Sequence, residues 1–586
     1  MSSRVCYRII PKPQSHQFEV SLRFFPEGRN DTVTLSLPAW IPGSYMIREF
    51  ARNIVHIEAS QDHRPLPLEK LDKHTWQAKS QGGAAIDVRY RVYAWDMSVR
   101  TSYLDGLRGF FNGTSVCLRV HGLEKQLCEV DIYPPEHMSE VWHVATGLAP
   151  ARPQDESGQF SDDHSPLRYL AKDYDELIDC PVEMGLMITA QFQACGVRHQ
   201  VVITGAYEDI DINRLCKDLQ PVCEAQIKLF EPRGVAPFSR YVFLIHATDN
   251  GYGGLEHRNS TALLCSRKDL PHTGLKDSSA EYRTFLGLCS HEYFHAWNVK
   301  RIKPSAFMEY LLDRENYTRQ LWLFEGFTSY YDDLILLRCG LLSPEQYADA
   351  LAKTYTSVMK NKGHTAQTVA ESSFDAWTKY YRQDENSPNS VVSYYTKGSL
   401  IALCLDALIR KETEGCQSLD DVMRWLWLNY GKTNRGVGET EFAAIVLAST
   451  GIAIDEFLQQ AVGSTEPLPV ESSLALLGYE LTAVEPDLKC DWGVVTAQVG
   501  ESLLVRHVRN GSSGEQAGLS AGDVLVAIDG YKATAEQVKR VMNRKRAGEV
   551  SRLQAFRRER LLETDLIWEA AGVTEWKIKP GKPVTK

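Results

Sequence analysis

The string His-Glu-Tyr-Phe-His at residues 291–295 constrains this chain more than any other feature. Two histidines four residues apart lie one above the other on a helix face, so both rings can reach one cation only if the segment is helical. Ser278-Ser279-Ala280-Glu281 has the form of a capping box ahead of such a helix. Pro304 pushes Lys303 out of the helical conformation. We therefore expect one helix over residues 279–302, with the motif well inside it.

This motif calls for a third metal ligand from a second helix. A catalytic zinc ion takes three protein ligands and keeps a fourth position open, and Glu292 can then act as a base toward water. The candidates for the third ligand are Glu309, Glu315 and Glu325. Glu325 is favoured, because it lies in the apolar run Leu321–Tyr331, where a carboxylate is costly to bury unless it is paired or binds a metal. Solvent can satisfy the other two glutamates, which lie in a polar connection.

The pattern of apolar residues divides the chain into regions. At ~150 residues per domain, 586 residues suggest three or four domains. Alternation at 32–37 and 86–92 predicts half-buried strands in a β-rich first region, which ends near the loop-like stretch 150–166. After residue 200 a buried strand is expected at 241–245, and short strands return beyond residue 467. Between these strands, helices are expected at 279–302, 317–339, 343–361, 397–412 and 418–429.

Charge and composition exclude several classes of protein. A net charge of −10 argues against nucleic acid as the main partner. No apolar run approaches the ~18–20 residues of a membrane span, and Met1–Pro11 lacks the apolar region of a signal peptide, which together predict a cytoplasmic protein with no membrane partner. The 13 cysteines contain no CxxC pair, so reduced thiols are expected. Cys289, two residues before the motif, is expected to be a core residue.

Two stretches of the chain resemble the glycyl aminopeptidase family of gluzincin zinc peptidases. One is the motif with its continuation Ala296–Pro304, and the other is Trp322–Phe327, which contains Glu325. Leu37–Arg48 is similar to the signature of that family's N-terminal β-domain. The aminopeptidase N clan shares the second stretch but usually has about 18 residues between the second histidine and the glutamate. Here the 29 residues 296 to 324 intervene, which suits the glycyl family.

The resemblance covers nearly the whole chain and implies a multidomain α+β fold. It implies an N-terminal β-sandwich-like domain over residues 1–165 and a thermolysin-like catalytic domain with a helical second half over residues 166–466. One zinc ion per chain is implied, bound by His291, His295 and Glu325, with Glu292 activating the water. The group that orients the zinc histidines stays open. Ser329 stands where thermolysin-like enzymes often keep an aspartate, and Asp332 or Asp333 is only a guess.

Two further segments acquire a role from the resemblance. Gly253-Gly254-Leu255-Glu256-His257 is similar to the exopeptidase stretch whose glutamate holds the free α-amine of the substrate, which implies Glu256 as amine anchor and Gly253 and Gly254 as backbone contacts. Glycines allow a peptide backbone to approach closely, and a carboxylate in a dry cleft pairs strongly with an ammonium group. Tyr394–Gly398 matches a Tyr-x-Lys-Gly pattern in which the tyrosine donates to the oxyanion, and the spacing selects Tyr395.

The C-terminal region resembles a PDZ domain of the bacterial protease type over Val505–Gly530. We expect this PDZ-like domain over residues 467–575, followed by a tail at 576–586, with the groove helix at 533–545. Such grooves capture peptide C-termini by strand addition. The usual carboxylate loop is missing, and Trp492–Val495 is the nearest candidate. Peptide capture and a purely structural role are both open for this groove.

These features together predict a zinc aminopeptidase that removes N-terminal residues from peptides. Small residues, Gly and Ala, are implied by the family. A zinc endopeptidase and a catalytically inactive peptide-binding scaffold are the alternatives. The intact motif together with Glu325 and Tyr395 argues against the scaffold. An endopeptidase would require that Glu256 does not face the cleft.

Overall fold

A computed structural model describes residues 4–26, 32–275 and 278–581. The chain divides into two compact units. The first comprises Met1–Asn316, Leu334–Leu341 and Leu426–Val437, and the second comprises Tyr317–Asp333, Leu342–Trp425 and Gly438–Lys586. Among the described residues, no helix is both long and apolar enough to cross a bilayer.

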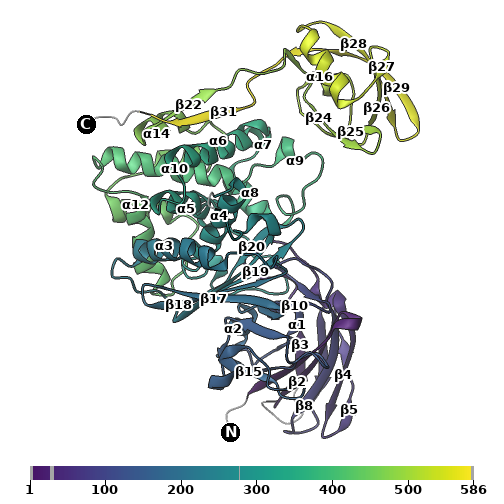
Figure 1. The fold of residues 1–586 in the computed structure, drawn as a ribbon, viewed down its shortest axis with the longest axis vertical. Coiled ribbons are helices and arrows are strands. Elements are labelled where there is room, and N and C mark those ends of the chain that lie inside the picture. Colours follow the sequence, from purple (N-terminus) through teal and green to yellow (C-terminus); the bar gives the residue numbers. More distant parts are fainter. Residues whose placement is uncertain (1–3, 27–31, 276–277, 582–586) are drawn as a thin grey trace. The chain divides into compact units, whose positions relative to one another are not determined.

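The first unit begins with three β-sheets (Figure 1), as the alternating pattern of the N-terminal region predicts. The largest is eight-stranded, in the order β14-β15-β12-β1-β2-β8-β4-β5. Tyr7, Phe18 and Tyr90 are buried on its inner face, while Arg89 and Arg91 of β8 are exposed. The bounds are β1 (Val5–Lys12), β2 (Gln17–Phe24), β4 (Ile54–Gln61), β5 (Arg64–Leu66), β8 (Ile86–Tyr93), β12 (Cys128–Ile132), β14 (Ala149–Pro150) and β15 (Leu167–Ala171).

Two four-stranded sheets complete this N-terminal β-domain. One has the order β11-β3-β7-β6 and the other β13-β16-β10-β9. The expected strands at 32–37 and 86–92 are confirmed by β3 and β8. The remaining bounds are β3 (Thr32–Ser36), β6 (Glu69–Lys70), β7 (Thr75–Lys79), β9 (Ser102–Leu104), β10 (Arg108–Phe111), β11 (Arg119–Val120), β13 (His143–Thr146), β16 (Val182–Gly185), and the short helices α1 (Gly113–Val116) and α2 (Tyr174–Ile178).

A five-stranded sheet follows in the same unit and carries the candidate site. Its order is β17-β18-β19-β21-β20, so β20 is an edge strand. Strands β18, β19 and β21 are parallel, and β20 pairs antiparallel with β21. Helices α3 and α4 pack against this sheet and against each other (Figure 1). The bounds are β17 (Met187–Ala194), β18 (Val197–Thr204), α3 (Ile212–Phe230), β19 (Arg240–Thr248), β20 (Tyr252–Glu256), β21 (Ser260–Ser266) and α4 (Ala280–Phe294).

The helix that carries the motif is shorter than the sequence predicts. Ser279 caps its start by accepting a hydrogen bond from the Tyr282 amide at 3.0 Å. The helix ends at Phe294, so His295 is its C-cap and the motif occupies the last turn, not the interior. The expectation of a helix to residue 302 was wrong. Residues 295–302 instead form irregular turns, in which the amides of Val299 and Lys300 both bond to the His295 carbonyl.

The chain beyond residue 317 is mainly helical. A π-helical turn, η6 (Trp322–Gly326), precedes α5 (Phe327–Arg338), and a second, η8 (Trp427–Gly431), follows α11 (Leu419–Leu426). The expected helices at 343–361 and 397–412 are confirmed by α6 and α10. The bounds are α6 (Pro344–Lys360), α7 (Gly363–Ala366), α8 (Val369–Phe374), α9 (Ser387–Ser390), α10 (Thr396–Glu412), α12 (Phe442–Thr450), α13 (Asp455–Ala461) and α14 (Val470–Leu476).

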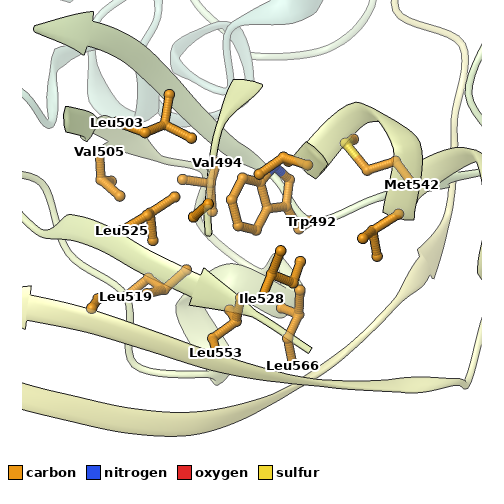
Figure 2. Packing of buried hydrophobic residues seen from close by; sticks show 14 of the residues in the cluster. Trp492, Val494, Leu503, Val505, Leu519, Leu525, Ile528, Met542, Leu553 and Leu566 are labelled. Carbon is orange, nitrogen blue, oxygen red and sulfur yellow. The ribbon is translucent and has the colours of Figure 1, made fainter. Parts of the chain in front are cut away.

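The C-terminal part of the second unit is a small β-domain with its own core. Figure 2 shows Trp492 among apolar side chains from the sheet and from the helix that carries Met542. The sheet has the order β24-β25-β26-β28-β29, with β27 paired to β26. The bounds are β24 (Val494–Val499), β25 (Ser502–Val508), α15 (Ser513–Gln516), β26 (Val524–Ile528), β27 (Tyr531–Lys532), α16 (Ala535–Arg544), β28 (Val550–Arg557) and β29 (Arg560–Ile567).

The residues assigned to a tail from the sequence include a strand. β31 (Trp576–Pro580) pairs antiparallel with β22 (Tyr479–Ala483) and packs against α6. A second short pair joins β23 (Cys490–Asp491) to β30 (Glu569–Ala570). The chain therefore enters and leaves the small β-domain through paired strands.

Candidate active site

The two motif histidines converge in the first unit. Their Nε2 atoms lie 3.0 Å apart, and the rings are nearly perpendicular at 85°. His295 Nδ1 lies 2.6 Å from the Asn298 carbonyl oxygen and donates its hydrogen there, which leaves Nε2 of His295 as the basic nitrogen. Hydrogen bonding of this kind fixes the tautomer that a metal needs. The residues therefore fit one cation between the two Nε2 atoms.

The turn that carries the histidines is held from α3 and β18. Gln226, fully buried on α3, donates from Nε2 to both the carbonyl and the hydroxyl oxygen of Ser290 at 2.9 Å. His199, fully buried on β18, bonds to the Val197 carbonyl through Nδ1 and to the Tyr293 hydroxyl through Nε2, each at 2.9 Å. Burial lowers the pKa of His199 to about 4, so this imidazole is neutral at physiological pH.

The base candidate Glu292 faces the edge strand at Gly254. A Cβ atom built on Gly254 would lie 2.1 Å from Glu292 Oε1 and 2.4 Å from its Cδ. A side chain at position 254 would therefore occupy the space of this carboxylate. This contact explains the second glycine of the Gly-Gly pair, because the strand can approach α4 so closely only without a side chain.

Glu256 lies beside the same carboxylate. Ligand atoms of Glu256, Glu292 and His295 all fall within 4.8 Å of one another, and the three side chains are buried. Oε1 of Glu256 accepts no hydrogen bond from any described residue, and Glu256 is 3% exposed. A cation between or beside two carboxylates this close in a dry site would relieve their repulsion. The arrangement can hold a positively charged group as well as a metal ion.

A charged cluster next to Glu256 supports its strand. Asp179, which is buried, accepts from Lys300 Nζ at 2.6 Å and from Arg258 Nε at 2.7 Å. Burial alone would raise the pKa of Asp179, but Arg258 and Lys300 outweigh it and hold that pKa well below its ordinary value. His257, adjacent to Glu256 in the chain, lies 3.6 Å from the same carboxylate. The cluster joins the turn after β20 to the segment after the motif.

Glu325 and Tyr395 belong to the second unit, where they lie close to each other. A Cβ atom built on Gly326 would lie 2.5 Å from the Cα atom of Gly398, so η6 and the start of α10 touch through their backbones. Glu325 is 2% exposed within η6. The Tyr395 hydroxyl lies 3.2 Å from the hydroxyl of Tyr381.

The phenol of Tyr395 is held in its protonated form. Burial raises the pKa of Tyr395 well above its ordinary value, and the negative charge of Glu325 adds to this effect. The hydroxyl is therefore an O–H donor at neutral pH. Such a group can stabilise a negative charge that develops on a substrate oxygen.

The structure thus brings the predicted site residues together in two groups. His291, Glu292, His295, Glu256 and Gly254 form one group in the first unit. Gly253 lies beside Gly254 on β20, in the same unit. The other group, in the second unit, is Glu325 with Tyr395. As expected, Cys289 is a fully buried residue of α4.

Sequence reasoning missed two contributors to the first group. The carbonyl of Asn298 orients His295. The Asp179 cluster escaped notice because its members are far apart in the chain. The basic run Lys300–Lys303 directly after the motif was the available signal for that cluster.

Two family models match different regions of this chain. Residues 7–186 match the model of the Peptidase M61 N-terminal domain, and residues 284–401 match that of the M61 glycyl aminopeptidase. The crystal structure of an aminopeptidase N family protein from Idiomarina loihiensis is similar over 99% of this chain and 98% of its own, with 39% sequence identity and a TM-score of 0.92. No curated protein matches the sequence significantly.

Proposed function

Because this chain belongs to the M61 glycyl aminopeptidase family and is a peptidase, we propose that it is a zinc-dependent aminopeptidase acting on peptides with a free N-terminus. Small first residues, Gly and Ala, are the proposed substrates. One observation carries the proposal. Glu256 places a buried carboxylate, with an oxygen that no described residue bonds, within 4.8 Å of ligand atoms of Glu292 and His295. An α-ammonium group is the natural partner of such a carboxylate.

We propose His291, His295 and Glu325 as the ligands of one zinc ion per chain. The facing Nε2 atoms and the hydrogen bond from His295 Nδ1 support the histidine pair. The burial of Glu325 in an apolar π-helical turn supports the third ligand, since two histidines and one glutamate are a common ligand set of catalytic zinc. Zinc in this site supplies a Lewis acid for the scissile carbonyl and the attacking water.

We propose that Glu292 transfers the protons of the reaction and that Tyr395 donates a hydrogen bond to the developing oxyanion. Glu292 takes the proton of the attacking water and later returns it to the leaving amine. Its carboxylate is packed against Gly254 of the edge strand β20, beside the buried carboxylate of Glu256. The protonated hydroxyl of Tyr395 donates to the oxygen of the tetrahedral intermediate, where charge develops only during the reaction.

A thermolysin-like arrangement of the sheet, α4 and the later helices is proposed for the catalytic region, and a PDZ-like fold for the small β-domain. A groove of about 490 Å³ beside β24 is lined by Val494 and Val495, and from α16 by Lys539 and Met542. The apolar side chains in this lining and the nearby strand suit an extended peptide C-terminus. We propose that such a peptide is a second partner of the chain.

A single assay tests the main proposal against its alternatives. Ala- and Gly-peptides with a free amine, and their N-acetylated counterparts, are incubated with the protein before and after treatment with a chelator. We expect hydrolysis of the free-amine peptides only, loss of activity with the chelator, and recovery on adding zinc. Internal cleavage of acetylated peptides would instead indicate an endopeptidase. No cleavage with zinc bound would favour the inactive scaffold.

A further inference from the structure

A loop of the N-terminal β-domain closes over the proposed amine anchor. A Cβ atom built on Gly43 would lie 2.5 Å and 2.7 Å from the two carboxylate oxygens of Glu256. Gly43 has φ +100°, a conformation that favours glycine. The closed loop is held by a bond from the Ser44 amide to the Ile41 carbonyl at 3.0 Å, and by Trp40, whose Nε1 donates to the Leu311 carbonyl at 2.8 Å.

A second segment of the same β-domain reaches the edge strand two residues earlier. Arg100 donates from Nη2 to the Gly254 carbonyl at 3.0 Å. The neighbouring Leu255 carbonyl accepts from the Thr261 hydroxyl on β21, so the Gly254 carbonyl points to the open edge of the sheet. Asn112, fully buried, holds the segment of Arg100 through a 2.9 Å bond to the Val99 carbonyl. The Gly254 carbonyl, which an added strand would use as a hydrogen-bond acceptor, is therefore already bonded to Arg100.

These two contacts define a short length of strand. Gly254 and Glu256 point to the same side of β20, and two residues of strand span about 6.8 Å. Gly254 packs on the base Glu292, and Glu256 lies under Gly43. Oxygens of the Glu256 and Glu292 carboxylates lie within 4.8 Å of each other, and this separation suits the ammonium and the carbonyl of one residue.

We propose that Gly43 and Arg100 are specificity-determining residues: the Gly43 loop bounds the cleft at Glu256, and Arg100 occupies the edge carbonyl that a longer N-blocked substrate would use for strand addition. The N-terminal β-domain would thus set both the exopeptidase action and the small first residue. This inference rests on the proposed function, since it assigns the residues that restrict the same site. Arg100 blocks strand addition at Gly254, and the Gly43 loop limits the volume above Glu256.

The test compares an Ala-peptide with its N-acetylated form in matched variants. Arg100→Ala should raise kcat/KM for the acetylated peptide at least tenfold, so that the preference for the free amine falls by the same factor. Arg91→Ala is the control, since Arg91 is an exposed arginine of the same domain. The control should leave the preference within twofold of the wild type.

Gly43→Ala provides an independent second variant. Its methyl group must displace the Glu256 carboxylate, so kcat/KM for the free-amine peptide should fall at least tenfold while bound zinc is unchanged. Gly122→Ala is the control, because Gly122 has φ +89° and a Cβ atom built there meets nothing within 4 Å. Comparing the two alanine variants separates backbone strain from the clash with Glu256.

Different results would refute the proposed function and this inference. A wild-type protein without activity on free-amine peptides would refute the proposed function. A wild-type aminopeptidase whose preference is unchanged in folded Arg100→Ala or Gly43→Ala would refute this inference alone. Because the variants act at different points of the cleft, either one that folds is decisive.

Discussion

Replacing Gly254 with alanine should disable the proposed base Glu292 without replacing a charged residue. The added methyl carbon would lie 2.1 Å from Glu292 Oε1 and 2.4 Å from Cδ, whereas ordinary contact begins at about 3.4 Å. The atoms in the way belong to the end of a flexible side chain, so the carboxylate rather than the strand should yield. It must retreat by roughly 1 Å. A displacement of this size can cost about 100-fold in rate, or roughly 2.7 kcal/mol of transition-state stabilisation.

Steady-state kinetics on an Ala-peptide, with metal content measured on the same samples, checks this prediction. We expect kcat to fall about 100-fold in Gly254→Ala with zinc still bound, because the proposed zinc ligands His291 and His295 are untouched. Gly83→Ala is the control, since a Cβ atom built on Gly83 meets nothing within 4 Å. If Gly254→Ala keeps kcat within threefold of the wild type, Glu292 is not the base that the geometry indicates.

Four other outcomes are expected. Glu325→Ala should lose both bound metal and activity, and zinc retained at wild-type stoichiometry would exclude Glu325 as a ligand. Glu292→Gln should retain zinc by metal analysis but show no turnover, whereas substantial residual kcat would point to another base. Glu256→Ala should lower kcat/KM for Ala- and Gly-amides roughly 30-fold or more, as expected for the loss of one partner of a buried ion pair, and should bring the preference for free amines over acetylated substrates toward unity. An unchanged preference would move the anchor to another carboxylate. The pKa of the buried His199 is about 4, so as the pH falls this residue is protonated in the unfolded state before it is protonated in the folded state. Its contribution to the free energy of unfolding is therefore complete above pH ~6.5 and is lost as the pH falls toward 4. Urea unfolding at pH 7 and pH 4.5 should show a loss of up to about 3 kcal/mol that a His199→Gln variant largely lacks, and an equal loss in that variant would assign the acid sensitivity to other groups.

Local patterns in the sequence were sufficient for features that depend on near neighbours. The histidine spacing and the cap at Ser279 predicted the helix that carries the motif, and it begins where expected. Alternation predicted β3 and β8, because one face of each strand is buried. The buried environment of Glu325 followed from the apolar residues around it, since a side chain inside such a run has few routes to solvent.

The end of that helix depended on contacts that no local pattern records. Nothing between the motif and Pro304 excludes a helix, yet the chain turns after Phe294. The turn allows the Asn298 carbonyl to reach His295 Nδ1, and it brings Lys300 to Asp179, over a hundred residues earlier in the chain. These bonds of buried polar groups outweigh the intrinsic preference of a few residues for helix.

The sequence by itself determined the chemical groups of the motif in this peptidase, because a histidine pair with an adjacent glutamate is defined by its spacing within a single helical turn. Only the tertiary structure decided how the substrate side is closed. Gly43 and Arg100 lie more than 150 residues before Glu256 and Gly254, and neither belongs to a pattern that predicts contact with them. Their positions are set by the packing of the N-terminal β-domain on the edge strand, where one loop covers a carboxylate and one guanidinium bonds to an edge carbonyl. Such contacts between distant segments exist only once both segments have folded, and for that physical reason spacing along the chain could not reveal them.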